Sequence, residues 1–277
     1  MTVLEVLNAA TDFLRKREVE SARLNAEHLL AHVLHKKNRI ELYIEFERTL
    51  GEAERAPLRD LVRRRSEGIP LQHLLGTVDF MGLEFATDAR ALIPRPETEQ
   101  LVGLVLAEGA GLRIADVGTG SGVIALTLAH KLPEAAITAC DISPDALALA
   151  RENADRHGLA GRITFFECDL LSGFDGPADA VVANLPYIST AEIATLSREV
   201  RHDPALALDG GPDGLDLVRR LAPEAAAKLA PGGLVALEIG LGQAPEVAQI
   251  LASHNFRDIS IRRDYQNIER FLIARHG

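Results

Sequence analysis

The alternation of apolar segments with helix-patterned segments after Leu112 constrains the fold of this chain most strongly. Apolar strands that alternate with helices are typical of a parallel sheet covered by helices on both faces. The last two strand candidates have no helix between them, so we expect one of them to run antiparallel. The expected strands are Arg113–Val117, Ala136–Asp141, Arg162–Phe166, Ala180–Ala183, Gly233–Ile239, Phe256–Arg262 and Arg270–Ala274. The expected helices are Val123–Leu132, Pro144–His157 and Leu215–Leu229.

The beginning of the chain has a different, helical pattern. Thr2 and Glu5 fit a capping box, in which each side chain bonds to the backbone of the other residue at the start of a helix. A second helix is predicted to begin at Ser21, and a third to run from about Glu52 to Ser66. This third helix ends in Arg63–Arg65, and because cations suit a helix C-terminus we interpret these arginines as a solvated helix end.

A β-hairpin is predicted between the two regions. The segment TVDFMGLEFATD alternates apolar and polar residues around Gly82. Pro94 and Pro96 then prevent a helix from starting before about Glu97. The sequence therefore predicts a helical N-terminal domain over residues 1–70, a hairpin linker over residues 71–95 and an α/β domain over residues 96–277.

The composition disfavours several classes of protein. Hydrophobic residues make up 47% of the 277 residues and charged residues 25%, which supplies enough apolar side chain for a buried core. No segment reaches the roughly 18 apolar residues that span a bilayer, and the N-terminal segment is not typical of a signal peptide. Two cysteines do not make a disulfide framework, which favours the reducing cytoplasm. The net charge of -10 and the 4% of aromatic residues disfavour direct nucleic-acid binding, and we expect a monomer without membrane contact.

A glycine-rich turn, DVGTGSG, lies between a predicted strand and a predicted helix. Glycines in this position let the backbone approach a ligand closely and point free N–H groups at it. The third glycine comes one residue earlier than in the dinucleotide pattern G-x-G-x-x-G. Taken alone, the turn also fits a purely structural bend. The residues that we expect to contact a cofactor here are Gly118, Thr119, Gly120, Ser121 and Gly122.

Acidic residues end the next two predicted strands. Asp141 lies 23 residues after Gly118, where a carboxylate can accept hydrogen bonds from both ribose hydroxyls of a nucleoside cofactor. Alternatively, Asp141 is an acid near the N-terminus of the following helix. The combination of a G-x-G-x-G turn with this acid fits S-adenosylmethionine better than NAD. Asp169 could bond to the adenine amino group and Leu170 could pack on the ring, although an ordinary surface turn fits these two residues equally well.

The tetrapeptide Asn184-Leu185-Pro186-Tyr187 ends the fourth strand, at the edge where ligands bind in open α/β sheets. A planar acceptor nitrogen is a poor nucleophile because its lone pair is delocalised. The Asn184 side-chain oxygen and the Leu185 backbone carbonyl can accept its two N–H groups, orient it and favour pyramidalisation. Pro186 stiffens the turn, and the Tyr187 ring can stack on the planar group. A polar turn that merely closes the strand is the alternative for an isolated tetrapeptide of this kind.

Other kinds of site are not indicated. The chain has no H-E-x-x-H, no paired C-x-x-C and no metal-ligand spacing among its histidines, so we expect no metal. It also has no G-x-S-x-G and no Walker A sequence. Cys140 and Cys168 end adjacent strands, and we expect both to be buried packing residues because a free cysteine behaves as a small hydrophobe.

Taken together, these segments resemble the HemK/PrmC family of S-adenosylmethionine-dependent N5-glutamine methyltransferases of bacterial peptide chain release factors. The resemblance covers nearly the whole chain and implies a seven-stranded, mostly parallel, Rossmann-like class I methyltransferase domain with a small helical N-terminal domain. It implies methylation of the side-chain amide of the glutamine in the release factor's Gly-Gly-Gln loop. The segments that carry it are PRPETEQLV, DVGTGSGVIALTLA, Asp141, NLPY and the stretch from Glu199 to Leu215.

The resemblance also implies roles for the matching residues. Gly118–Gly122 and Asp141 would bind the cofactor, with Asp169 and Leu170 around its adenine. Asn184 would contact both cofactor and substrate, and Asn184–Tyr187 would form the catalytic site that holds the glutamine. The N-terminal helices would dock the release factor.

One position departs from the family pattern. The usual tetrapeptide is N-P-P-Y, and Leu185 occupies the second position here. Leucine keeps the backbone carbonyl, so catalysis should survive with a less rigid turn. N-L-P-Y also resembles the rRNA adenine dimethyltransferases, which makes N6-adenine methylation of rRNA or DNA the alternative function. The helical N-terminal block, the acidic balance and the RPETE segment argue against it. A non-catalytic ribosome- or nucleotide-binding module on the same fold is a third hypothesis.

Overall fold

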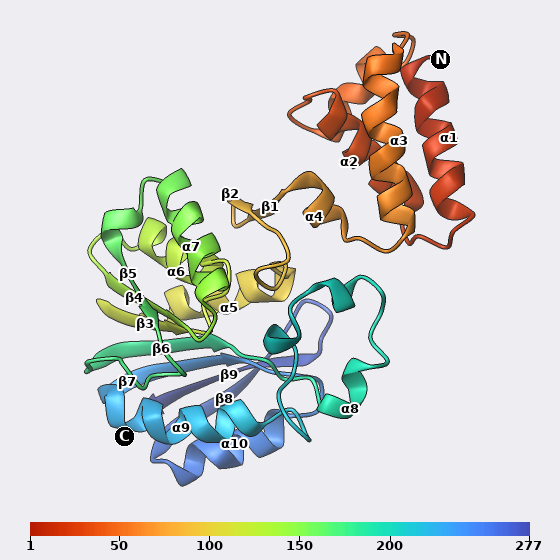
Figure 1. The fold of residues 1–277 in the computed structure, drawn as a ribbon. Helices are drawn as coiled ribbons and strands as arrows, with labels where there is room; N and C mark the ends of the chain where they lie inside the picture. The colour runs from red at the N-terminus through yellow and green to blue at the C-terminus, as the bar shows by residue number, and fades with distance from the viewer. The chain divides into compact units, whose positions relative to one another are not determined.

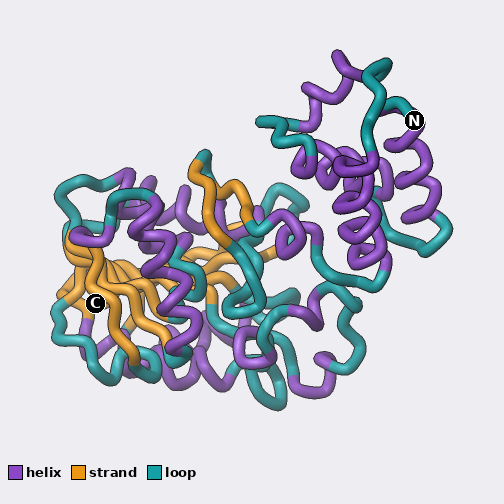
Figure 2. The backbone as a smooth tube through the Cα atoms, turned by 45° about the horizontal axis from the view of Figure 1, so that its top comes forward, coloured by secondary structure: helices purple, strands orange, loops and turns teal.

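A computed structural model describes all residues from Met1 to Gly277. The chain forms two compact units (Figures 1 and 2). The first comprises Met1–Thr77 together with Ser197–His202, and the second comprises Val78–Leu196 and Asp203–Gly277. The first unit thus extends beyond residue 70, where the sequence analysis ends the helical domain, and it includes six residues from much later in the chain. No helix is long and apolar enough to cross a membrane.

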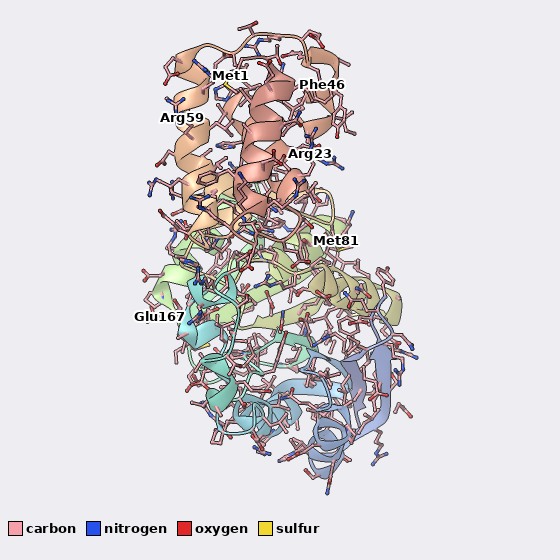
Figure 3. The ribbon with its side chains drawn as sticks, turned by 90° about the vertical axis from the view of Figure 1, so that its right-hand side faces the viewer. Met1, Arg23, Phe46, Arg59, Met81 and Glu167 are labelled. Atoms are coloured by element: carbon pink, nitrogen blue, oxygen red, sulfur yellow. The ribbon has the colours of Figure 1, made fainter.

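The first unit is helical, as its sequence pattern predicts. The Thr2 backbone N–H donates to Glu5 and the Glu5 backbone N–H donates to Thr2 Oγ1, so the expected capping box is confirmed. Ser21 precedes the second helix, but its side chain makes no cap bond and its backbone is left-handed. Charged side chains such as Arg59 lie on the outside of this unit (Figure 3). Its helices are α1 (Val3–Arg15), α2 (Ala22–Val33), the 3₁₀-helix η1 (Arg39–Glu45), α3 (Glu52–Ser66), α4 (Leu71–Leu75) and η3 (Val200–His202).

The interpretation of Arg63–Arg65 as a solvated helix end is wrong for Arg65. This side chain is buried, and it donates hydrogen bonds to Asn25 Oδ1 at 2.7 Å and to the Ile69 carbonyl at 3.2 Å. It also pairs with Glu199. Arg65 therefore fixes the Ser197–His202 segment within the first unit, a long-range contact that helix periodicity does not reveal.

The expected β-hairpin is present as β1 (Thr77–Phe80) and β2 (Leu83–Ala86). Both turn residues, Met81 and Gly82, have positive φ, which matches the right-handed twist of the two strands. Phe80 and Phe85 are fully buried in the core that the second unit forms on one face of its sheet. The short helix α4 directly before the hairpin was not predicted.

The second unit is built on a seven-stranded sheet with the order β5-β4-β3-β6-β7-β9-β8. All neighbours are parallel except that β9 runs antiparallel to both β7 and β8, so the predicted antiparallel strand is confirmed. The strands are β3 (Arg113–Val117), β4 (Ala136–Asp141), β5 (Ile163–Glu167), β6 (Ala178–Asn184), β7 (Leu229–Glu238), β8 (Phe256–Arg263) and β9 (Glu269–His276).

Helices cover both faces of this sheet, as the sequence pattern predicts (Figure 1). The helices α5, α6 and α7 pack on one face, and α9 and α10 pack on the other. The start of α5 at Pro96 agrees with the expectation that Pro94 and Pro96 prevent an earlier helix, whereas α10 was not among the expected helices. The helices are α5 (Pro96–Glu108), α6 (Val123–Lys131), α7 (Pro144–Arg156), α8 (Thr190–Ile193), α9 (Asp216–Lys228) and α10 (Ala244–Ser253), with the short 3₁₀ segments η2 (Ala160–Arg162) and η4 (Ala205–Ala207).

The strand order places a topological switch between β3 and β6. From β3 the chain moves outward to β4 and β5, and it then returns to pair β6 with the other edge of β3. Val117 at the end of β3 is in register with Cys140 of β4 and with Ala183 of β6. The loops that follow these strands therefore meet at one edge of the sheet, where open α/β sheets bind ligands.

Candidate methyltransferase site

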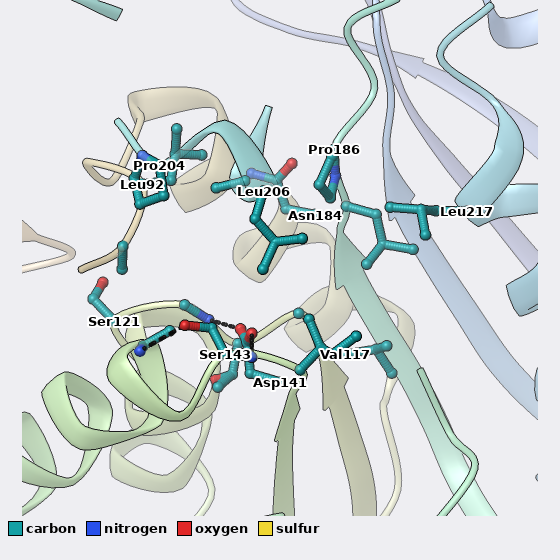
Figure 4. Close-up of a pocket in the computed structure, with 18 of the residues that line it drawn as sticks. Leu92, Val117, Ser121, Asp141, Ser143, Asn184, Pro186, Pro204, Leu206 and Leu217 are labelled. Atoms are coloured by element: carbon teal, nitrogen blue, oxygen red, sulfur yellow. Dashed lines mark hydrogen bonds between the residues drawn. The ribbon is translucent and has the colours of Figure 1, made fainter. Parts of the chain in front are cut away.

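A cavity of about 260 Å³ lies at this switch point (Figure 4). Its wall is formed by the loops after β3, β4, β5 and β6 and by two further segments around residues 90–98 and 204–209. The structure thus brings together most of the site residues that the sequence predicts. Those that line the cavity are Gly118, Thr119, Gly120, Ser121, Asp141, Asp169, Leu170, Asn184, Leu185 and Pro186.

The glycine loop after β3 is held rigidly beneath the cavity. The backbone N–H groups of Gly118 and Thr119 both donate to the Cys140 carbonyl at 2.9 Å. Asp116 is fully buried and accepts hydrogen bonds from Thr119 Oγ1 at 2.6 Å and from the Ala125 N–H at 3.1 Å. Burial raises the pKa of Asp116 to about 7. These bonds fix the loop against the adjacent strand and the start of α6.

Gly122 does not line the cavity, although the sequence analysis places it in the cofactor site. It has a φ of +85° and is the N-cap residue of α6. A side chain at this position would bring its Cβ to 2.9 Å from Leu126 Cδ1 and 3.1 Å from Ala150 Cβ. Close packing at the start of α6 therefore accounts for this glycine.

Asp141 connects the loops that follow β3 and β4. Its two carboxylate oxygens accept hydrogen bonds from the Gly120 N–H and the Ser143 N–H, each at 2.9 Å (Figure 4). Burial raises the pKa of Asp141, and the backbone hydrogen bonds partly oppose this effect. Ser143, rather than Asp141, caps α7, since its Oγ accepts the Ala146 N–H at 3.2 Å. Asp141 thus lines the cavity and also bonds to the backbone of the residue that caps α7.

The loop after β5 contributes a polar and an apolar residue. Leu170 is buried and lines the cavity, and it has a positive φ of 53°. Asp169 lies at the rim, where Arg220 donates a hydrogen bond to it at 2.5 Å. Cys140 is buried as expected, but Cys168 is partly exposed and lines the cavity, so the expectation of two buried packing cysteines is wrong for Cys168.

Asn184 is the last residue of β6 and faces the cavity. Its Nδ2 donates to Thr98 Oγ1 at 3.0 Å. The Leu185 side chain is buried over the glycine loop, where a Cβ on Gly118 would come within 2.9 Å of Leu185 Cδ2. A side chain at position 118 would therefore clash with the Leu185 side chain unless that side chain moved.

Tyr187 does not line the cavity, so the structure does not place its ring where the sequence analysis expects stacking on a substrate. Its ring edge lies against Gly240, because a Cβ on that glycine would come within 3.1 Å of Tyr187 Cδ2. The Tyr187 carbonyl accepts a hydrogen bond from Gln243 Nε2 at 3.0 Å. Burial raises the pKa of the Tyr187 hydroxyl, and the nearby Glu238 raises it further.

Two segments that the sequence analysis left without a role form the opposite wall. Figure 4 shows Leu92, Pro204 and Leu206 across the cavity from Asp141. Asp203 joins the two segments, since its carboxylate accepts the Ile93 N–H at 3.1 Å and an Arg95 guanidinium N–H at 2.8 Å. The family resemblance includes both segments, but nothing in their spacing indicates that they meet.

Solved structures share this architecture. The chain matches a methyltransferase from Pyrococcus furiosus with a TM-score of 0.55 at 18% identity, over 71% of this chain and 90% of that one. It matches the hMettl16 catalytic domain with a TM-score of 0.60 at 16% identity, over 79% of this chain and 82% of that one. Residues 98–211 match the family model described as methyltransferase small domain. The fold and the site therefore define a class I methyltransferase.

Sequence comparisons identify the family within this class. Residues 5–76 match the model described as PrmC N-terminal domain. The release factor glutamine methyltransferase of Deinococcus radiodurans is 44% identical over 100% of this chain and 99% of its own length. That of Geobacter sulfurreducens is 41% identical over 100% of this chain and 97% of its own length. The chain belongs to the release factor glutamine methyltransferase family, which confirms the resemblance found in its sequence.

Proposed function

We propose that this protein transfers a methyl group from S-adenosylmethionine to the side-chain amide nitrogen of the glutamine in the Gly-Gly-Gln loop of a peptide chain release factor. The observation that carries this proposal is that one cavity contains both the glycine loop with Asp141 and the Asn184-Leu185-Pro186 turn. The family relationship supports the same activity.

The residues of the cavity fit a nucleoside cofactor. The Asp141 carboxylate accepts backbone hydrogen bonds on both oxygens and also lines the cavity, where its remaining lone pairs can accept from ribose hydroxyls. Leu170 supplies a buried apolar surface suited to an adenine ring. Arg220 donates to one oxygen of Asp169, and the remaining lone pairs of this carboxylate can accept from the adenine amino group. When bound, S-adenosylmethionine supplies an electrophilic methyl carbon on a positively charged sulfur.

The Asn184-Leu185-Pro186 turn is proposed to hold the acceptor amide. The Asn184 Nδ2 is already committed to Thr98, so its oxygen is the atom available to a substrate N–H. The Leu185 backbone carbonyl would accept the second N–H, and Pro186 would stiffen the turn. Held by two acceptors, the amide nitrogen is oriented toward the methyl carbon and its lone pair becomes more localised.

The chemistry then needs no covalent enzyme intermediate. The amide nitrogen forms a bond to the methyl carbon as the carbon–sulfur bond breaks, and S-adenosylhomocysteine is the second product. The alkylated nitrogen carries an extra proton that is acidic enough to pass to water. The protein therefore contributes orientation and hydrogen-bond acceptors rather than a strong general base.

The first unit is proposed to dock the release factor. This unit lies outside the methyltransferase fold, and its residues 5–76 match the family model described as PrmC N-terminal domain, so it is the part of the chain to which we assign docking. We further propose that the enzyme acts as a monomer in the cytoplasm and makes no direct contact with nucleic acid.

The test is a competition between substrate classes. The protein is incubated with methyl-labelled S-adenosylmethionine and either a purified release factor or rRNA, and the label in each macromolecule is counted. The proposal predicts label in the release factor alone. Label in rRNA alone would favour the adenine methyltransferase alternative, and label in neither would favour a binding module.

A further inference from the structure

Asn184 belongs to a buried chain of hydrogen bonds that extends behind the cavity. Thr98 lies in the first turn of α5 and Glu238 ends β7, where it is in register with Asn184 of β6. Asn184 Nδ2 donates to Thr98 Oγ1 at 3.0 Å, and Thr98 Oγ1 donates to Glu238 Oε2 at 2.8 Å. Thr98 is 3% exposed and Glu238 is 4% exposed. Three polar groups from three elements are thus aligned at the end of the sheet.

The order of donors in this chain follows from its chemistry. When Glu238 is ionised, its carboxylate only accepts hydrogen bonds, so the Thr98 hydroxyl directs its single hydrogen to Glu238. The hydroxyl oxygen then has only lone pairs left for Asn184, which must present its NH2 group. Asn184 also lowers the pKa of Glu238 by hydrogen bonding, which places the same NH2 group on the Glu238 side.

The direction matters because the two ends of an asparagine amide have nearly the same shape. Packing alone does not decide whether the oxygen or the NH2 group faces the cavity. An NH2 group facing the cavity would meet the N–H groups of an acceptor amide and could not accept from them. The partners behind Asn184 therefore decide whether it can bind an N–H donor.

We propose that Thr98 and Glu238 are positioning residues that fix the orientation of the Asn184 amide and so present its oxygen to the substrate nitrogen. This inference rests on the proposed function, since it assigns Asn184 the role of acceptor. The surroundings of Glu238 are consistent with it. Burial raises the pKa of Glu238 to about 7, and Thr98 and Arg270 oppose this effect, so the carboxylate is ionised and the hydrogen bonds have this order above about pH 7, where the variants below are assayed.

Variants at Thr98 separate this role from packing. Thr98→Val keeps the size of the side chain but removes the hydroxyl, so kcat should fall about 10- to 100-fold. Thr98→Ser keeps the hydroxyl and should restore most of the lost kcat. Calorimetric affinity for S-adenosylhomocysteine should stay within about twofold of wild type in both variants, because neither removes a cofactor contact proposed above.

Thr127→Val is the matched control. Thr127 is also a fully buried threonine on a helix that covers the same face of the sheet, and it has no place in the site. This variant should keep the wild-type kcat. An equal loss of kcat in Thr98→Val and Thr127→Val, or in Thr98→Val and Thr98→Ser, would show a packing effect and overturn the inference.

Glu238→Gln provides a second variant that keeps the shape of the buried side chain. The NH2 group of the glutamine can donate to Thr98 Oγ1 and reverse the direction of the hydrogen bonds, so that the Asn184 oxygen no longer faces the substrate. The value of kcat should therefore again fall. The double variant with Thr98→Val should lose less than the two single losses combined, since both act through Asn184. Fully additive losses of kcat would contradict the inference that both residues act through a single series of hydrogen bonds.

The two proposals fail in different ways. A wild-type enzyme that methylates no release factor would refute the proposed function. An active wild-type enzyme together with a fully active Thr98→Val variant would refute this inference alone.

Discussion

Replacing Asp141 by alanine should weaken cofactor binding while leaving the second unit folded. The carboxylate has about four lone-pair positions. Two of them accept the backbone N–H groups of Gly120 and Ser143 at 2.9 Å. The Ile142 backbone N–H also acts on this carboxylate, and the lone-pair positions that remain on the cavity side are proposed to accept from the ribose hydroxyls of S-adenosylmethionine.

The size of the effect follows from these contacts. A hydrogen bond to a charged group contributes about 1.5–3 kcal/mol. In the alanine variant water can enter the space and satisfy the ribose hydroxyls, so the loss should be closer to one such bond than to two. We expect the affinity to fall by about 1.5–3 kcal/mol, which is about 10- to 100-fold.

Titration calorimetry with S-adenosylhomocysteine and its 2′-deoxy analogue tests this reasoning. In the wild type, removing the 2′-hydroxyl should weaken binding, whereas in Asp141→Ala it should change the affinity little. Asp141→Asn is the matched control, because it keeps the shape and one acceptor oxygen but replaces the other acceptor by a donor. The affinity of Asp141→Asn for S-adenosylhomocysteine should lie between those of the wild type and of Asp141→Ala. An unchanged affinity in Asp141→Ala, or the same 2′-deoxy effect in wild type and variant, would refute the ribose contact.

Three further predictions concern other parts of the chain. Asn184→Ala should reduce kcat severely while calorimetric cofactor affinity stays nearly intact, and an unchanged kcat would remove Asn184 from the acceptor site. Burial raises the pKa of Glu238 from 4.5 to about 7, so the folded state binds this proton more tightly and the contribution to stability falls as pH rises between those values. Between pH 4 and pH 8, Glu238→Gln should therefore become more stable relative to wild type by about 3 kcal/mol of unfolding free energy in denaturant titrations, and a difference that does not change with pH would contradict the shift. A protein beginning at Val78 should bind cofactor normally but methylate intact release factor poorly, and equal initial rates would exclude a docking role for the first unit.

The sheet and the ends of its strands could be predicted from the sequence. Strands β3 and β4 have the predicted bounds, because buried parallel strands are short apolar runs between glycine turns and helices. The same pattern indicates that the loops after β3, β4 and β6 meet at one edge of the sheet. Asp141 and Asn184 were therefore correctly expected near one another, because both end strands at this edge.

The walls and supports of the site could not be predicted in this way. Asp203 joins two segments that are about a hundred residues apart, and Glu238 reaches Thr98 across a similar distance along the chain. Such pairs depend on tertiary packing that local periodicity does not encode. The same reason explains why the burial of Arg65 and the packing of the Tyr187 ring on Gly240 were missed.

The central claim is that the cavity holds a carboxamide beside the cofactor and makes its nitrogen a methyl acceptor. Tandem mass spectrometry of a release factor after incubation with the enzyme and S-adenosylmethionine tests it most directly. The account predicts a gain of about 14 Da on the side chain of the Gly-Gly-Gln glutamine, absent with Asn184→Ala and absent when that glutamine is replaced by glutamate. A methyl group on any other residue, or an equal gain with Asn184→Ala, would contradict it.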